Sequence, residues 1–133
     1  MYYIKFIMKN NFFKLVKYLY YFFLAVLFVL YLFPGSLIGY FLYGNLRLQP
    51  VLIDNPIGTS INHLLYFMLL SILASICSSE KIQILTNFYF IFLVSIFLEI
   101  SHFFIPNRAF EIYDLLANTT GVIVIFLIKK IIK

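Results

Sequence analysis

Long apolar stretches separated by short polar connections dominate the pattern of this chain. The strongest stretch covers residues 18–33, contains no charged residue and ends at a Pro-Gly pair. Further apolar stretches cover residues 61–78, 82–103 and 112–130. A helix needs about 20 apolar residues to cross the hydrocarbon core of a bilayer. We therefore predict an all-α membrane protein with four transmembrane helices at about these residues.

The segments around the first apolar stretch have distinct characters. Residues 1–17 are basic and aromatic, and we predict a cytoplasmic tail there, followed by a single transmembrane domain over residues 18–133. A charged start before an apolar run is also typical of a signal peptide, but no A-x-A-like pattern follows, so we favour a retained helix. Residues 34–60 hold most of the Pro and Gly, which predicts an irregular outer loop with a short interfacial helix near residues 37–43.

Composition supports a lipid environment. Of the 133 residues, 64% are hydrophobic and 11% are charged, whereas a soluble domain is about half apolar and about a quarter charged. The net charge is +5, and its lysines cluster near the chain ends beside apolar runs, where they would face anionic headgroups. We therefore expect the bilayer, and not nucleic acid, as partner. The single Cys77 forms no intramolecular disulfide and is predicted to be a packing residue.

The distribution of basic residues predicts the orientation. Four spans would put both termini on one side of the membrane, together with Lys81 in the turn between the second and third spans. The lysines of both tails lie on that side, whereas the other side carries Arg47 and Arg108. The positive-inside rule then places both termini in the cytoplasm, an N-in/C-in arrangement.

Polar residues gather where the third apolar stretch ends and the fourth begins. Glu99 and His102 are three residues apart and hence share one helix face. Asp114, Asn118 and Gly121 form a single stripe at helical spacing. Because small residues let helices approach closely, we expect this stripe to face the third helix.

The predicted topology brings the outer ends of the last three helices to one level. His63 begins the second helix, and Arg108 lies in the last connection, where it can reach Glu99, Asp114 or an external anion. Polar groups near lipid cost free energy unless they find partners or water, so we predict an extracytoplasmic ligand-binding pocket. Its predicted residues are His63, Glu99, His102, Arg108, Asp114 and Asn118.

Structural interpretations of the same residues remain open. Asp114 could act only as a cap at a helix N-terminus. Glu99 could form a structural ion pair with Arg108 or a plain hydrogen bond with His102. Asn118 could join helices without binding a ligand. His63 could be no more than an interfacial residue, and Glu111 and Arg47 are predicted to be solvated loop charges.

The same residues could also bind a metal ion or catalyse a reaction. Glu99-x-x-His102 has the spacing of helical metal sites, and His63 and Asp114 could complete one. Only one such pair exists and Arg108 shares its level, so we predict no metal and no cofactor. Glu99 and His102 could act as a general base and acid at a lipid headgroup, but no nucleophilic Ser or Cys stands beside them, and no catalytic residue is assigned.

The motifs of this region resemble those of the VanZ-like family. The resemblance rests on Glu99, on the P-x-R turn of Pro106 to Arg108, and on the D-x-x-x-N-x-x-G pattern of residues 114–121. The NHLLYF segment of residues 62–67 resembles the family's His motif. Family members usually carry an Asp-Lys pair just before that His, where this chain has Thr-Ser, so roles that depend on those charges do not carry over. The resemblance covers about residues 30–128.

The resemblance implies a small multi-pass protein of the bacterial cytoplasmic membrane. The family's named member is linked to low-level resistance to the glycopeptide teicoplanin. We therefore expect a cell-envelope protein that lowers glycopeptide susceptibility by binding a lipid-linked cell-wall precursor or a lipoglycopeptide, without catalysing a reaction. The alternative is a membrane-embedded enzyme that acts on an envelope lipid with Glu99 and His102 as acid–base pair. A third interpretation is a scaffold whose polar groups only lock helices together.

Overall fold

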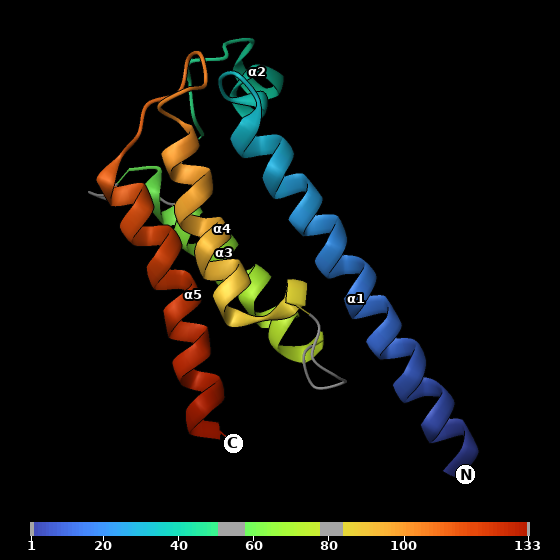
Figure 1. Ribbon diagram of the computed structural model, residues 1–133. Helices are drawn as coiled ribbons and strands as arrows, with labels where there is room; N and C mark the ends of the chain where they lie inside the picture. Colours follow the sequence, from blue (N-terminus) through green and yellow to red (C-terminus); the bar gives the residue numbers. More distant parts are fainter. Residues whose placement is uncertain (1, 51–57, 78–83, 133) are drawn as a thin grey trace.

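The computed structural model describes residues 2–50, 58–77 and 84–132, and every regular element within these ranges is helical (Figure 1). The all-α prediction is therefore confirmed for the described part of the chain. The charged turn at residues 80–81 and the predicted helix ends at Ser78 and residues 82–83 lie outside it. In chain order the elements are α1 (Tyr2–Leu32), α2 (Leu37–Tyr43), α3 (Ser60–Cys77), the 3-10 helix η1 (Ile84–Thr86), α4 (Phe88–Ser101) and α5 (Ile112–Ile132).

Three of these helices are long and apolar enough to cross a membrane. They are α3, α5 and the part of α1 from Asn11 to Leu32. Helix α4 is apolar but has only 14 residues, which at 1.5 Å per residue gives a length of about 21 Å. Its N-cap explains its late start, because the Asn87 side chain accepts a hydrogen bond from the N–H of Tyr89 at 3.2 Å. The helix predicted at residues 82–103 is thus shorter than expected at both ends.

Helix α1 starts much earlier than residue 18. It begins at Tyr2 and runs for 31 residues without interruption. The basic segment of residues 1–17 contains no Gly or Pro, so nothing in the sequence ends the helix there. The segment that looked like a tail is therefore, from Tyr2 onward, the first part of α1.

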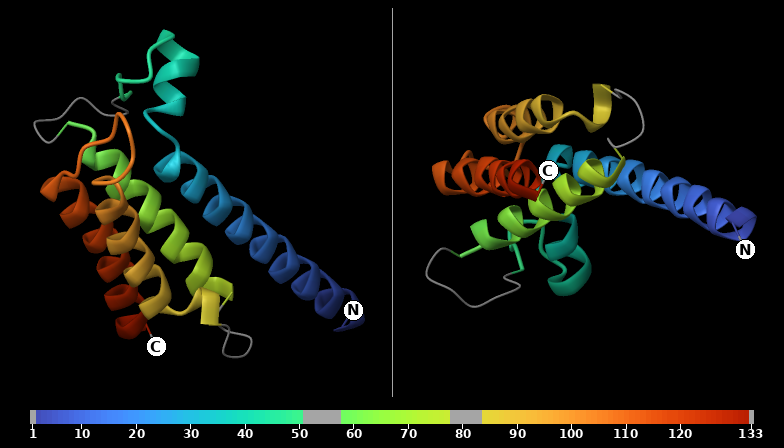
Figure 2. Two further views of the ribbon diagram at one scale, coloured as in Figure 1. Left: turned by 45° about the horizontal axis from the view of Figure 1, so that its top comes forward. Right: turned by 90° about the horizontal axis from the view of Figure 1, so that it is seen from below.

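The core lies where α1 crosses the bundle of α3, α4 and α5 (Figures 1 and 2). One face of α1 is buried there at helical spacing. Its buried side chains are Val16, Tyr20, Leu24, Leu27 and Tyr31. Seen from below, α5 lies between α3 and α4, and the N-terminal part of α1 extends beyond all three (Figure 2). The N-terminal part of α1 thus stands clear of the bundle, while its C-terminal part reaches the polar end of the molecule.

Close approach of α5 to α3 is possible because of Gly121. A Cβ atom at this position would lie 2.7 Å from the carbonyl oxygen of Leu64 and 3.2 Å from Cβ of Phe67. The stripe of Asp114, Asn118 and Gly121 is buried, as its spacing predicted. The prediction that the whole stripe faces the helix at residues 82–103 was wrong in part, because Gly121 packs against α3.

Residues 34–50, which follow α1, are more ordered than an irregular loop. The short helix expected near residues 37–43 is present as α2, with the Ser36 hydroxyl accepting a hydrogen bond from the N–H of Gly39 at 2.9 Å. The chain then turns back, and the N–H of Ser36 donates to the carbonyl of Leu46 at 2.7 Å. Residues 34–50 therefore form a folded cap beyond the end of α1.

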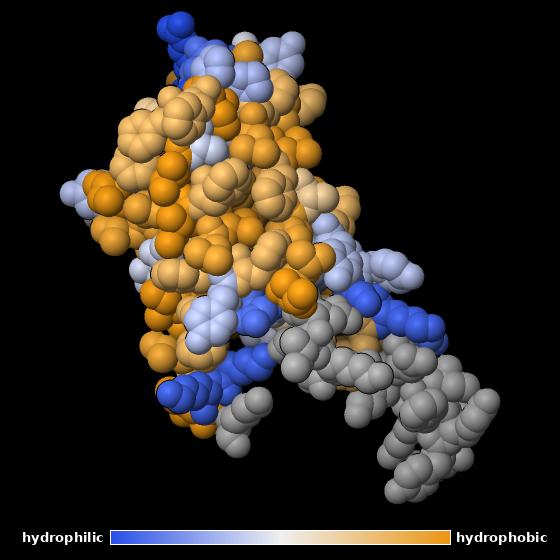
Figure 3. Space-filling model, viewed as in Figure 1, coloured by the Kyte–Doolittle hydropathy of each residue, from blue (hydrophilic) through white to orange (hydrophobic). Residues whose placement is uncertain are grey.

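The two ends of the molecule differ from its middle. Figure 1 places both termini at one end and α2 with the α4–α5 connection at the other, which agrees with the predicted placement of both termini on one side. Figure 3 shows a broad hydrophobic zone between more hydrophilic ends. This is the surface expected of a protein whose middle contacts lipid.

Candidate functional site

Five of the six predicted site residues form one hydrogen-bonded cluster at the end of the bundle nearest α2. They come from three helices: His63 from α3, Glu99 and its neighbour His102 from α4, and Asp114 with Asn118 from α5. Each lies within about a turn or two of a helix end, so packing the three helices side by side brings them to one level. The structure therefore brings five of the six residues together, and their role in binding a ligand stays a prediction.

His63 and Asp114 form the first half of the cluster. Nε2 of His63 lies 3.5 Å from Oδ2 of Asp114, and both side chains are almost fully buried. The other carboxylate oxygen of Asp114 accepts a hydrogen bond from the Ser60 hydroxyl at 2.5 Å. Asp114 is therefore not merely a cap of α5, and His63 is not merely an interfacial residue.

Glu99 is the centre of the second half. Its side chain is completely buried, and its Oε1 lies 3.2 Å from Nδ1 of His102 and accepts a hydrogen bond from the N–H of Glu111 at 3.3 Å. Its Oε2 accepts a hydrogen bond from Nδ2 of Asn118 at 3.2 Å. These donors explain how a carboxylate persists near the C-terminus of α4, where the helix dipole opposes it. The hydrogen bond to His102 that was considered from the sequence is confirmed.

Tyr31 joins the two halves and was missed in the sequence. Its hydroxyl donates to Oδ1 of Asn118 at 2.8 Å and lies 2.6 Å from Nδ1 of His63. Its ring stacks on the ring of His102, with 5.3 Å between centroids. Because the chain is rich in aromatic residues, the sequence did not distinguish this Tyr from the others as a site residue. The available signal was its place on the buried stripe of α1, four residues after Leu27.

Ser60 is the second residue that sequence analysis missed. It stands at one of the two positions where the resemblance led us to expect a charged pair, and its short hydroxyl reaches Asp114 instead. That departure from the family pattern was the signal available. A neutral donor here leaves the charge of Asp114 uncompensated at this contact.

Arg108 does not form the predicted ion pair with Glu99 or Asp114. In the described part of the chain, Asp114 is ion-paired with His63, and Glu99 with His102. The Arg108 guanidinium instead donates to the carbonyl oxygens of Phe33, at 3.4 Å, and Leu30. Leu30 lies in the last turn of α1, whose carbonyls lack helical partners, and Phe33 follows its end, so Arg108 ties the α4–α5 connection to the end of α1.

Burial and neighbouring charges affect the two ionisable side chains of this connection. Partial burial lowers the pKa of Arg108, and the nearby Tyr31 and carboxylates oppose that shift; the guanidinium stays cationic. Burial, and then the charges of Asp114 and Glu99, raise the pKa of Glu111. The Glu111 side chain is exposed, as expected, and so is Arg47.

A pocket of about 110 Å³ opens beside the cluster, between the end of α1, the start of α3 and the cap. Its polar wall includes Tyr31, Asn62, His63, His102 and Arg108. Sites for drug-sized ligands usually measure about 300–1,000 Å³, so this pocket suits one small polar group. Glu99 and Asp114 lie behind this wall, next to the two His residues.

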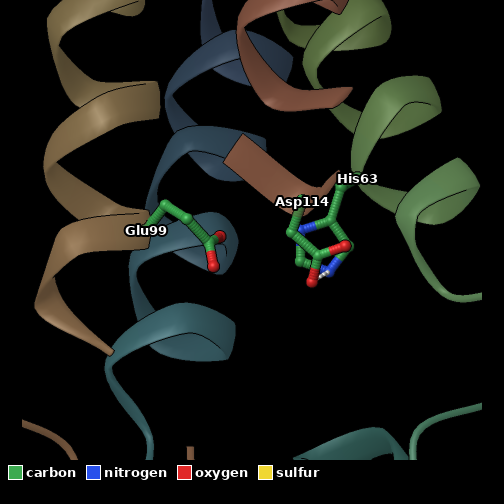
Figure 4. A group of neighbouring side chains, drawn as sticks. All are labelled: His63, Glu99 and Asp114. Carbon is green, nitrogen blue, oxygen red and sulfur yellow. Dashed lines mark ion pairs between the residues drawn. The ribbon is translucent and has the colours of Figure 1, made fainter. Parts of the chain in front are cut away.

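The cluster also contains a group of side chains that could hold a metal ion. His63, Glu99 and Asp114 each offer one ligand atom, and these atoms all lie within 4.8 Å of one another. Figure 4 shows the three side chains reaching toward a common space from three helices. These are three of the four residues that the sequence offered as possible metal ligands, and His102 is not among them.

Comparison with known proteins gives one match. A family model described as VanZ/LLP1 matches residues 3–133, which includes α3, α4, α5, nearly all of α1 and every residue of the cluster. No match was found among curated proteins or among solved structures.

Proposed function

The chain belongs to the VanZ/LLP1 family and is a multi-pass membrane protein, and from this premise we propose that it binds the polar head of a lipid-linked ligand in the bacterial cell envelope. Binding there would lower susceptibility to glycopeptide antibiotics such as teicoplanin, the effect linked to the family's named member. The proposed localisation is the cytoplasmic membrane.

The pocket beside the cluster carries this proposal. Arg108 has five N–H donors, and the carbonyls of Leu30 and Phe33 leave some of them for an anion that enters the pocket. His63 and His102 line the same wall and add further polar contacts. A phosphate group is the anionic head that an Arg recognises well.

The size of the pocket favours a lipid-linked precursor over a whole lipoglycopeptide. A volume of about 110 Å³ accommodates a head group but not a large antibiotic. Helix α2 borders the pocket through Leu37 and Ile38 and also exposes Phe41, which has 81% of its surface accessible. A hydrocarbon tail could lie along this apolar face while its phosphate meets Arg108.

The proposed topology has four spans, with α4 as the shortest and both termini in the cytoplasm. Lys129 and Lys130 lie in the last turn of α5, at the end of the molecule opposite the cluster. The positive-inside rule places that end in the cytoplasm, which puts the pocket on the extracytoplasmic side. Residues 18–133 would then form one transmembrane domain behind a cytoplasmic start of α1.

Direct binding tests the proposal. The purified protein in lipid nanodiscs would be titrated with a polyprenyl phosphate, and complexes would be counted by native mass spectrometry. We expect saturable binding that Arg108→Lys weakens at least about tenfold, because a Lys keeps the charge but loses the guanidinium fork. The matched control is Arg47→Lys, an exposed position in the cap. Equal binding by wild type and Arg108→Lys would refute a phosphate site at this pocket.

An enzyme remains the second candidate, because of His102. Its Nδ1 faces the Glu99 carboxylate, which only accepts hydrogen bonds, so Nδ1 carries the proton and Nε2 keeps a lone pair. Nε2 is buried and has no hydrogen-bond partner in the described part of the chain. A His oriented by a carboxylate in this way can act as a general base. Turnover of an envelope lipid by wild type, lost in His102→Gln, would favour this alternative.

A further inference from the structure

The hydrogen-bond donors of the cluster can be assigned one after another, starting from Glu99. Its carboxylate only accepts hydrogen bonds, so the Asn118 atom that faces it must be the amide nitrogen. The amide oxygen of Asn118 therefore faces Tyr31 and accepts the hydrogen bond from its hydroxyl at 2.8 Å. A Tyr hydroxyl has a single proton, and this contact uses it.

This assignment determines the state of His63. The Tyr31 oxygen lies 2.6 Å from Nδ1 of His63, and because its proton is already donated to Asn118, Nδ1 must be the donor. A neutral imidazole carries one N–H, so Nε2 of His63 then has a lone pair. That lone pair faces Oδ2 of Asp114, which is also an acceptor, across 3.5 Å. Two acceptors at this separation repel each other, and a cation between them would remove that repulsion.

The distance distinguishes the two possible cations. A proton shared by imidazole and carboxylate brings nitrogen and oxygen to about 2.7–2.9 Å. Two ligands of one tetrahedral zinc ion, with bonds of about 2.0–2.2 Å, lie about 3.3–3.6 Å apart. The observed 3.5 Å lies in the range for two ligands of one metal ion. A carboxylate oxygen of Glu99 completes a group whose atoms lie within 4.8 Å of one another, so the group must contract slightly for all three to bind one ion.

We propose that His63, Glu99 and Asp114 bind a divalent transition-metal ion, for which Zn²⁺ is the representative. One imidazole and two carboxylates suit such an ion better than Mg²⁺ or Ca²⁺, which prefer oxygen ligands alone. Each ligand comes from a different helix (Figure 4), so the ion would join α3, α4 and α5 at their polar ends. The sequence had led us to expect no metal, because only one Glu-x-x-His pair exists and Arg108 was predicted to lie at the same level.

The neighbours of the three ligands are those that a metal site requires. The second nitrogen of His63 donates to Tyr31, the second oxygen of Asp114 accepts from Ser60, and Glu99 accepts from Asn118. Such contacts orient ligands and are typical of metal sites. The local charge favours the same conclusion, because two buried carboxylates adjoin the single guanidinium of Arg108, which leaves a net negative charge that attracts a cation.

The pocket supplies room for a further ligand. Three protein ligands leave a coordination position for water, and His63 borders the pocket of about 110 Å³. His102 lines the same pocket, and only 3% of its surface is exposed. Its Nε2 has no hydrogen-bond partner in the described part of the chain. This free lone pair is an acceptor for a water molecule held there.

Metal content measured on the purified protein tests this inference, and it does so without reference to the lipid ligand. Protein purified in detergent without chelators would be analysed by inductively coupled plasma mass spectrometry, then stripped with EDTA and titrated with Zn²⁺ by calorimetry. We expect close to one ion per chain and a binding affinity that Asp114→Asn weakens at least about 100-fold. Asp114→Asn retains an oxygen that can accept from Ser60.

Two controls keep the outcome interpretable. Glu111→Gln removes an exposed carboxylate from the adjoining connection and should leave Zn²⁺ binding unchanged. Glu99→Gln is a second test of the site, with circular dichroism confirming that each variant stays helical. Folded wild type that takes up no Zn²⁺, or that binds it as tightly after Asp114→Asn, would overturn the proposal and leave a proton between His63 and Asp114. Lipid binding could persist in that case, so the two proposals fail separately.

Discussion

The hydroxyl of Tyr31 donates a hydrogen bond to Oδ1 of Asn118 at 2.8 Å, across 87 positions of the chain. This contact ties α1 to α5 inside an apolar bundle. Because Asn118 in turn donates to Glu99, it also links the first helix to the carboxylate of α4. The polar cluster is thus assembled from all four long helices.

Removing the Tyr31 hydroxyl should destabilise the protein. Tyr31→Phe keeps the ring that stacks on His102 but leaves the buried Oδ1 of Asn118 without its donor. An unsatisfied buried polar group costs about 1–3 kcal/mol. Thermal unfolding in detergent should show a lower midpoint than wild type. The control is Tyr18→Phe, because Tyr18 has 72% of its surface exposed; equal effects of the two substitutions would contradict the role of the hydroxyl.

Arg108 should hold the end of α1 against the α4–α5 connection. In Arg108→Gln the shorter side chain no longer reaches both carbonyls of Leu30 and Phe33. We expect faster hydrogen–deuterium exchange in the last turn of α1 and a loss of about 1–3 kcal/mol, since hydrogen bonds to charged groups contribute about that much. Arg47→Gln serves as the exposed control. Unchanged exchange at the end of α1 in Arg108→Gln would show that this contact is not stabilising.

Gly121 should tolerate no side chain. In Gly121→Ala the new Cβ would lie 2.7 Å from the carbonyl oxygen of Leu64, and because that atom belongs to the backbone of α3, the two helices must separate. Overpacking of this kind costs about 1–3 kcal/mol. The unfolding midpoint in detergent should fall, whereas Thr120→Ala on an exposed part of the same helix should change it little. A Gly121→Ala protein as stable as wild type would refute the close packing of α5 on α3.

Gly39 should control the shape of the cap. A Cβ here would lie 1.7 Å from the carbonyl oxygen of Leu48, so Gly39→Ala must displace the segment that carries Gln49 and Pro50, two residues of the pocket wall. Limited proteolysis should cut this segment faster in Gly39→Ala than in wild type. Gly44→Asn is the matched control, because its left-handed backbone suits Asn and nothing lies within 4 Å of the added Cβ. Equal cleavage rates would contradict the tight packing.

The sequence predicted relationships within a helix better than relationships between helices. The pair of Glu99 and His102 and the stripe of Asp114 and Asn118 followed from helical spacing alone, and the structure confirms both. The short helix α2 followed from apolar residues bounded by Gly and Pro. These features depend on local geometry, which a single sequence expresses directly.

Contacts between helices were harder to predict, for physical reasons. Arg108 has a long side chain on a connection, so several partners were within its reach, and only packing shows that it caps α1. Tyr31 resembles the many other aromatic residues of the chain until α1 is placed against α5. The start of α1 at Tyr2 was missed because hydrophobicity, on which the prediction rested, indicates spans and not helix length.

Antibiotic susceptibility tests the central claim most directly, namely that the pocket beside the polar cluster acts in the bacterial envelope. A bacterial host would express wild type, Arg108→Lys or Arg47→Lys at membrane levels matched by immunoblot, and the inhibitory concentrations of teicoplanin and vancomycin would be measured. We predict that wild type and Arg47→Lys raise the teicoplanin value more than the vancomycin value, and that Arg108→Lys does so far less. A well-expressed wild type that changes neither value, or an Arg108→Lys protein as protective as wild type, would contradict the proposed function.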